Sequence, residues 1–238
     1  LQIKNFRSLQ DVEIPKLGLI NLIVGNNNSG KSSLIESLLI LANNADEEVL
    51  NNLAYQHGEP TLIDQDEEDF LPAFQPFESF FSHRKFPMED GVKIVIGELD
   101  GLNVLTIEHA FEKEEMIRLE DDEGNPLRRI KREIIPKSEI SEKLDDPDFN
   151  LRINSILRVE NKNVINRISL ESDRRRNSTL SRSLDSKLNI PHSYIPTSFL
   201  DPDELALDWD KLVLTPYQDH IIEALQIIEP SLENISFV

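Results

Sequence analysis

The sequence contains no cysteine, which excludes disulfides and metal sites built on thiolates. This absence suits a reducing compartment, so we expect a cytoplasmic protein. No apolar run approaches the roughly 18 residues that a membrane span requires. No signal peptide pattern is visible either, and no membrane contact is expected. The 238 residues show no internal repeat and no low-complexity linker. They suffice for one large domain or two small ones with a sizeable core.

Basic residues are scarce: 25 Lys and Arg face 44 Asp and Glu, a formal net charge of −19. Such acidity opposes nonspecific nucleic-acid binding by the chain as a whole. The charge is uneven, however, because residues 43–91 hold twelve acidic side chains against two basic ones, whereas residues 118–183 hold fifteen basic against thirteen acidic. The second segment therefore offers candidate DNA phosphate contacts, although basic runs are more often simply solvated. The candidates are Arg128, Arg129, Lys131, Arg132, Arg174, Arg175 and Arg176.

The most informative stretch is Gly25-Asn26-Asn27-Asn28-Ser29-Gly30-Lys31-Ser32, which fits the phosphate-loop pattern G-x-x-x-x-G-K-[ST]. Leu19 to Val24 ahead of it is a short, mostly apolar run, which predicts a buried parallel strand. Residues 32–41 behind it carry apolar side chains at helical spacing and predict a helix that ends near Asn43. A strand, a loop and a helix in this order form the setting that a phosphate site needs; the alternative is a chance match in a turn.

In that setting the backbone N–H groups of the loop wrap the phosphates, and the helix N-terminus adds partial positive charge. Lys31 would reach the β- and γ-phosphates and is the catalytic candidate, while the Ser32 hydroxyl would be a ligand of Mg²⁺. The predicted nucleotide contacts within the loop are Gly25, Asn26, Asn27, Asn28, Ser29, Gly30, Lys31, Ser32 and Ser33.

Around this loop, residues 1–4 and 11–14 alternate apolar and polar side chains and predict two half-buried strands. Residues 46–57 predict a helix that the sequence Gly58-Glu59-Pro60 breaks. An acidic run, 64–69, is followed by an aromatic cluster for which a small core is favoured over a docking face for a partner. The cluster comprises Phe70, Phe74, Phe77, Phe80 and Phe81.

Further along, residues 92–99 and 102–107 predict a hairpin, which residues 108–118 could extend. Residues 138–170 are predicted to be helical in pieces. Their expected buried side chains are Ile153, Ile156, Leu157, Val164, Ile165 and Ile168. A polar stretch to about Ser186 predicts a mobile loop.

The end of the chain combines strand and helix signals. Residues 193–197 and 235–238 predict strand segments. Two helices are predicted to begin at Asp201-Pro202 and Thr215-Pro216, and the second is expected to end at Pro230.

Several classes of phosphate-loop protein fit poorly. A guanine-nucleotide switch needs Asn-Lys-x-Asp, but Asn161-Lys162-Asn163-Val164 lacks the aspartate. Neither the basic lid nor the substrate carboxylate of a small-molecule kinase can be placed. An apolar run ending in Asp-Glu, which would hold Mg²⁺ through water, is missing, and Lys93 to Asp100 is a poor imitation of it. The hydrolytic residues are therefore incomplete.

The turn Asn5-Phe6-Arg7-Ser8, followed about twenty residues on by the phosphate loop, resembles the N-terminal half of the SMC/RecF-like ABC ATPases. The Asn27-Asn28 pair is closer to OLD-type and related bacterial defence ATPases. Asn28 stands where glycine is frequent, which is tolerable because asparagine is enriched at positive φ. The resemblance covers about the first 42 and the last 46 residues, and the last segment supports it weakly.

The resemblance implies an α/β fold: a P-loop NTPase of the ABC-head type, N-terminal part, with an antiparallel β subdomain and helical insertions. Four segments would follow one another. Residues 1–42 would form the strands of the β subdomain and the core around the phosphate loop, and residues 43–91 an acidic helical insertion. Residues 92–185 would form a β hairpin with a basic helical insertion, and residues 186–238 would return to the ATPase core. The signature loop and the Asp-Glu motif would lie further toward the C-terminus.

For function, the resemblance implies a homodimer that sandwiches ATP and Mg²⁺ between two heads, and Arg7 matches an arginine that approaches the phosphates. DNA and a nuclease domain or partner are possible further partners. Two hypotheses stay open: an ATP-driven clamp or switch in DNA repair or antiviral defence, and a regulatory or structural module that binds nucleotide without turnover.

Overall fold

The computed structural model describes residues 1–62, 75–99, 101, 103–120, 126–143, 153–162, 164–170, 190–195 and 202–235. The chain forms two compact units, Leu1–Pro191 and His192–Val238. The first unit holds the sheet, the phosphate loop and the core, whereas the second holds two short helices.

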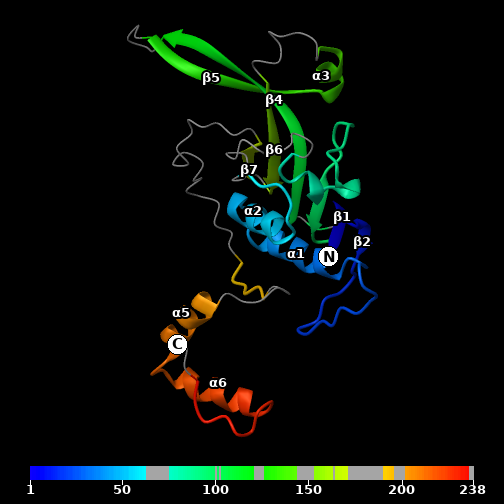
Figure 1. The fold of residues 1–238 in the computed structure, drawn as a ribbon. Helices are drawn as coiled ribbons and strands as arrows, with labels where there is room; N and C mark the ends of the chain where they lie inside the picture. Colours follow the sequence, from blue (N-terminus) through cyan, green and yellow to red (C-terminus); the bar gives the residue numbers. More distant parts are fainter. Residues whose placement is uncertain are drawn as a thin grey trace. The chain divides into compact units, whose positions relative to one another are not determined.

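One antiparallel sheet dominates the first unit (Figure 1). Its path runs β2-β1-β3-β4-β6-β7, and β5 pairs with β4 beside this path. The strands are β1 (Gln2–Phe6), β2 (Leu9–Glu13), β3 (Ile94–Gly97), β4 (Val104–Glu120), β5 (Pro126–Ile135), β6 (Ile153–Asn161) and β7 (Val164–Ser169). The long insertion between β2 and β3 therefore brings β3 back beside β1.

Two predicted strand pairs are confirmed. Strands β1 and β2 form a tight hairpin with Gln2 opposite Glu13 and Ile3 opposite Val12. Asn5 and Arg7 flank the end of β1 with positive φ values of 57° and 50°. Strands β3 and β4 also form the expected hairpin. Strand β4 continues past residues 108–118 to Glu120, as its predicted extension requires.

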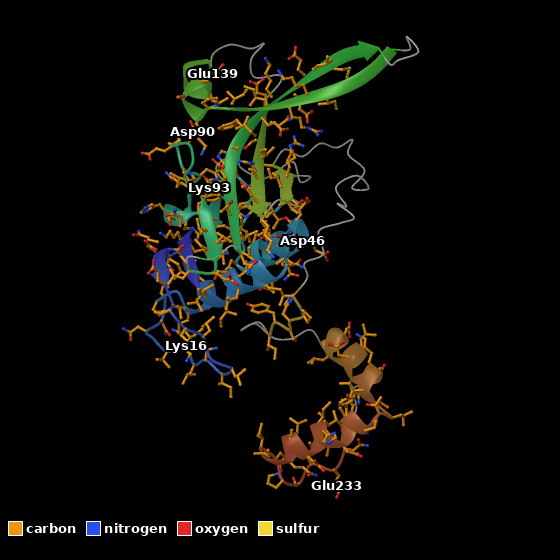
Figure 2. All side chains as sticks on the ribbon, turned by 180° about the vertical axis from the view of Figure 1, so that it is seen from behind. Lys16, Asp46, Asp90, Lys93, Glu139 and Glu233 are labelled. Atoms are coloured by element: carbon orange, nitrogen blue, oxygen red, sulfur yellow. The ribbon has the colours of Figure 1, made fainter. Side chains whose placement is uncertain are left out.

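The second half of β4 pairs with β5 and forms a long two-stranded arm (Figure 1). Side chains project from both faces of this arm (Figure 2). Arg132 lies opposite Glu114 in the register, and Met116 lies opposite Ile130. The candidate DNA contacts Arg128, Arg129, Lys131 and Arg132 therefore belong to a strand, whereas residues 174–176 lie outside the described residues.

The predicted helical region 138–170 is wrong for most of its described part. Only α3 (Lys137–Lys143) is helical, and β6 and β7 occupy residues 153–161 and 164–169. The spacing of the apolar residues fits a helix or a strand at Ile156, Leu157 and Val159. This segment is a strand because it pairs with β4 at nine positions. Ile156, Leu157 and Ile168 are buried as expected, but Ile153 is only half-buried, and Val164 and Ile165 are exposed on the outer strand.

The core lies between the sheet and two helices, α1 (Lys31–Ala42) and α2 (Glu47–Gln56). Both helices and their ends near Asn43 and Gly58 were predicted from the sequence. Asp46 caps α2 by accepting a hydrogen bond from Glu48 N (Figure 2). The fully buried side chains include Ile3, Phe6, Ile40, Leu50, Leu53, Ile94, Ile96, Leu105 and Ile107.

Three of the clustered aromatics, Phe77, Phe80 and Phe81, belong to this same core and are each about 1% exposed. Phe77 precedes the short 3-10 helix η2 (Glu78–Phe80), Phe80 ends it, and Phe81 lies between it and η3 (Ser82–Arg84). The core interpretation is thus confirmed for these residues. Phe70, Phe74 and the acidic run 64–69 lie outside the described residues.

The predicted buried strand over residues 19–24 is wrong. This run forms no strand, and Leu19, Ile20 and Leu22 are 106%, 93% and 87% exposed. A strand buried on both faces needs neighbouring strands along its edges. No strand among the described residues pairs with this run.

The second unit contains α5 (Pro202–Leu212) and α6 (Pro216–Gln226). Both predicted starts are confirmed, and Thr215 caps α6 by accepting a hydrogen bond from Tyr217 N. Helix α6 ends at Gln226 rather than at Pro230. Residues 193–195 and 235 are not in strands, and the remainder of those two predicted strands lies outside the described residues. No helix in the described part of the chain combines the length and apolarity needed to cross a bilayer.

Candidate functional site

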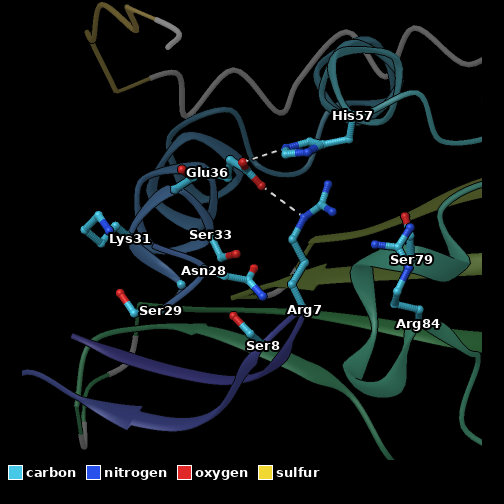
Figure 3. Close-up of a pocket in the computed structure, with 12 residues that line it drawn as sticks. Arg7, Ser8, Asn28, Ser29, Lys31, Ser33, Glu36, His57, Ser79 and Arg84 are labelled. Carbon is cyan, nitrogen blue, oxygen red and sulfur yellow. Dashed lines mark hydrogen bonds and ion pairs between the residues drawn. The ribbon is translucent and has the colours of Figure 1, made fainter. Parts of the chain in front are cut away.

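A cavity of about 530 Å³ opens where the phosphate loop, the turn after β1 and the segment around η3 meet (Figure 3). Seven of the predicted contacts line it: Arg7, Asn28, Ser29, Gly30, Lys31, Ser32 and Ser33. The lining also includes Ser8, Glu36, His57, Ser79 and Arg84. Gly25, Asn26 and Asn27 belong to the same loop but do not line the cavity.

The loop has the local geometry of a tight turn before a helix. Ser29 N donates a hydrogen bond to Asn26 O at 3.3 Å. Asn28 adopts φ 63°, as expected for an asparagine in a glycine-like position, and Gly30 adopts φ 88°. Helix α1 begins at Lys31, the residue at which the motif predicts a helix start.

Gly30 is required for its conformation and for the space around it. A Cβ at this position would lie 2.8 Å from Leu9 Cδ2 and 2.9 Å from Ser8 Oγ. The loop therefore packs directly against the start of β2. This contact joins the phosphate loop to the β1–β2 turn that carries Arg7.

The first turn of α1 carries no negative charge of its own. Gly30 provides no side-chain cap, the first turn contains no acidic residue, and the first helical bond runs from Leu34 N to Gly30 O. The N–H groups of the preceding helical residues consequently have no acceptor within the helix. Together with the helix dipole they form a local environment that favours an anion.

Lys31 folds back over the loop. Its Nζ donates hydrogen bonds to Gly25 O at 2.9 Å and to Asn26 O at 2.7 Å. The side chain is half-buried and both hydrogen bonds lie at the surface, so the ammonium group can exchange these carbonyl oxygens for phosphate oxygens. This position is compatible with the predicted role of Lys31.

Arg7 contacts two buried carboxylates, Glu36 (Figure 3) and Glu59. Its Nη1 and Nη2 donate hydrogen bonds to the two Glu59 oxygens at 2.7 and 3.0 Å. Its Nε lies 3.0 Å from Glu36 Oε2, and its guanidinium stacks 4.9 Å from the centre of the Phe80 ring. Glu36 also contacts His57 Nε2 at 2.8 Å.

Glu59 holds its negative charge despite its burial. Burial by itself raises the pKa of this carboxyl group, but hydrogen bonding from Arg7 and the charges of Arg7 and Arg84 outweigh it and lower the pKa. Arg84 Nη2 lies 3.2 Å from Glu59 Oε1. One carboxylate thus joins two arginines at the wall of the cavity.

The residues present fit a nucleotide with a phosphate chain. The cavity combines a helix N-terminus, a lysine and two arginines with a glycine whose Cβ would collide with the β1–β2 turn. Bound Mg²⁺ would neutralise phosphate charge, and the Ser32 hydroxyl, which lines the cavity, would hold it.

Sequence reasoning missed Glu36, His57, Glu59 and Arg84. Glu36 had a detectable signal, because it is a single acid on the apolar helix that follows the loop and is 2% exposed. Glu59 and Arg84 had no signal in the sequence, since they lie 52 and 77 residues from Arg7 in the chain. Only the folded arrangement brings them together.

Comparison with known proteins gives three matches. The family model described as AAA ATPase domain matches residues 1–205. A DNA replication and repair protein RecF from Haemophilus ducreyi is 30% identical over 115 residues, which are 45% of this chain and 32% of that protein. An uncharacterized protein of Methanocaldococcus jannaschii is 45% identical over 40 residues, which are 17% of this chain and 18% of that protein.

The chain therefore covers less than a third of the length of RecF and less than a fifth of that of the archaeal protein. No solved structure matches the chain. The family match, unlike the two pairwise matches, extends over most of the sequence and includes both the phosphate loop and Arg7.

Proposed function

The chain belongs to the AAA ATPase domain family, and on this premise we propose that it is the ATP-binding part of an SMC/RecF-like ATPase head. It would bind ATP with Mg²⁺ and hydrolyse it once signature and Asp-Glu motifs are supplied. The observation that carries the proposal is the cavity on which the phosphate loop, the start of α1 and Arg7 converge. In this assignment the loop amides and Lys31 hold the phosphates, and Ser32 is the Mg²⁺ ligand.

The direct test measures Mg²⁺-dependent ATP binding by this chain and ATP turnover by the complete protein. Lys31→Ala should abolish turnover and weaken ATP binding strongly, because it removes the cation that compensates the β- and γ-phosphates. Lys16→Ala is the matched control, since Lys16 is an exposed lysine in the loop after β2 (Figure 2). Turnover that survives Lys31→Ala would refute the proposal.

We further propose that two such heads dimerise around ATP, so that ATP binding shifts the population toward a closed state and hydrolysis reverses it. In the complete protein, ATP should then double the mass measured by light scattering. Lys31→Ala should remain at the mass of the nucleotide-free protein. A mass that does not respond to ATP would contradict this part of the proposal.

A role with DNA is a separate part of the proposal. It is supported by the similarity to RecF, whose name states DNA replication and repair, and by the basic residues of β5. An OLD-type defence role and control of a nuclease rest only on the Asn27-Asn28 resemblance.

The alternative function is a module that binds nucleotide without turnover. It is favoured by the missing apolar run ending in Asp-Glu. ATP binding that depends on Lys31, together with no detectable turnover by the complete protein, would support it over the ATPase.

A further inference from the structure

Arg84 lies at the cavity on a segment of strained backbone. His83 and Arg84 adopt consecutive positive φ values of 64° and 57° in η3, although neither is glycine. Non-glycine residues in this region are uncommon, and such strain concentrates at ligand clamps and active sites. Arg7 and Asn28, which line the same cavity, also have positive φ, so this conformation recurs around the site.

The surrounding core holds this segment in place. Phe80, the last residue of η2, and Phe81, which lies between η2 and η3, are buried, and Phe81 forms a bridge with Phe6 of β1. Arg7 N donates a hydrogen bond to Phe80 O at 2.8 Å. The backbone that carries Arg84 is thus fixed to the backbone that carries Arg7.

The Arg84 guanidinium remains accessible from the cavity. Its side chain is 67% exposed, and its Nη2 lies 3.2 Å from Glu59, a carboxylate to which Arg7 donates two hydrogen bonds. Lys31 and Arg84 lie on either side of Arg7 around the same cavity (Figure 3). A ligand that bridges the phosphate loop and this segment would therefore meet a cation at each end.

We propose that Arg84 is a second phosphate-contacting arginine of this site and that it reads the terminal phosphate of a nucleoside triphosphate. The inference rests on the proposed nucleotide binding and adds selectivity for triphosphate over diphosphate. The loop amides and Lys31 hold the inner part of the phosphate chain. Arg84 exchanges its contact with Glu59 for a contact with the terminal phosphate oxygens. Its planar guanidinium can donate two parallel hydrogen bonds to such an anion.

The exchange leaves no unpaired charge on Glu59. Its charge stays compensated by Arg7 when Arg84 leaves, because both Arg7 hydrogen bonds run to this carboxylate. A diphosphate that occupies the inner positions leaves Arg84 on Glu59. The expected signature is therefore a loss of ATP affinity with little loss of ADP affinity.

The test compares ATP and ADP affinity, both with Mg²⁺, by titration calorimetry on the wild type, Arg84→Gln, Lys85→Gln and Lys31→Ala. Lys85 is the matched control because it is the neighbouring exposed cation and lines a different cavity. Arg84→Gln should weaken ATP binding about tenfold and ADP binding less than about threefold, as expected for the loss of one charge-assisted contact. Lys85→Gln should match the wild type for both nucleotides.

Equal affinities of Arg84→Gln and Lys85→Gln for ATP would overturn the inference, and so would an equal weakening of ATP and ADP by Arg84→Gln. In both cases Lys31-dependent ATP binding by the wild type leaves the proposed function standing. A wild type that binds no ATP would instead overturn the proposed function and this inference together. Circular dichroism of each variant separates a loss of contact from a loss of fold.

Discussion

Arg7 and Glu59 form a bidentate ion pair between residues that are 52 positions apart in the sequence. The two guanidinium Nη atoms of Arg7 donate one hydrogen bond to each oxygen of the Glu59 carboxylate. Both side chains are nearly buried, at 10% and 3% exposure. The pair fixes the residue predicted to approach the phosphates to the end of the α2 region. It is therefore a structural element of the site as well as a part of its charge distribution.

Glu59→Gln should lower the free energy of unfolding by about 2–3 kcal/mol, because it leaves Arg7 buried with less compensation. Urea denaturation measures this change. The control is Glu13→Gln, an exposed carboxylate on β2 that should change stability by less than about 0.5 kcal/mol. Equal effects of the two substitutions would contradict the assigned importance of the pair.

The difference in stability between Glu59→Gln and the wild type should depend on pH. Since folding lowers the Glu59 pKa below its ordinary value of 4.5, the stability it contributes is present above that pH and is lost as the pH falls toward the folded-state pKa. The stability difference between wild type and Glu59→Gln should shrink below about pH 4.5. A difference that stays constant on acidification would show that the carboxylate charge is not the cause.

His109 should make stability fall between about pH 6.5 and 4. It is buried, with its ring stacked 3.9 Å from Phe86 and its Nε2 2.9 Å from Ser155 Oγ. Burial, with a smaller contribution from the Lys137 charge, lowers its pKa from 6.5 to about 4. The unfolded chain therefore takes up a proton at a pH where the folded chain does not, which costs about 3 kcal/mol over this range.

Thermal denaturation at a series of pH values measures this dependence. His109→Phe keeps a ring between its neighbours and removes the titration, so its stability should vary less between pH 6.5 and 4. His83→Asn, which replaces an exposed histidine at positive φ with a tolerated residue, is the control and should keep the wild-type dependence. A His109→Phe variant with the wild-type pH profile would refute the assignment.

The exposed run 19–24 should contribute little to the stability of this chain. Replacing Leu19, Ile20 and Leu22 by threonine should change the free energy of unfolding by less than about 0.5 kcal/mol and reduce aggregation, because these side chains bury almost no surface. Leu53→Ala, in contrast, should cost about 2–5 kcal/mol, because Leu53 is 1% exposed. Denaturant unfolding and light scattering distinguish the two, and a large loss from the triple variant would contradict the exposure.

DNA binding, if it depends on β5, should be sensitive to its charges and to salt. Reversing Arg128, Arg129, Lys131 and Arg132 to glutamate should weaken DNA binding by the complete protein and flatten its dependence on salt concentration. Arg132 should contribute less to DNA binding than the other three residues, because its charge already pairs with Glu114 at 2.9 Å. Arg158→Glu on β6, the strand that also pairs with β4, is the control. Unchanged DNA affinity would exclude this surface.

The sequence predicted well those features that depend on neighbouring residues. The start of α1 at Lys31, the positive φ of Asn28, the Thr215 cap and the β3–β4 hairpin all follow from side chains within a few positions of one another. It failed where apolar spacing fits two structures. The β6 pattern became a strand because β4 offers nine paired positions, a partner that no local signal specifies.

By itself, then, the sequence determined the phosphate loop and its helix, because the conformations of glycine and asparagine at positive φ and the apolar spacing of the helix are set locally. The tertiary structure alone decided that Arg7 faces Glu36 and Glu59, that Arg84 joins them, and that residues 19–24 form no strand. Ion pairs and strands need partners that are distant in the chain, and only the packing of the sheet against α1 and α2 selects those partners.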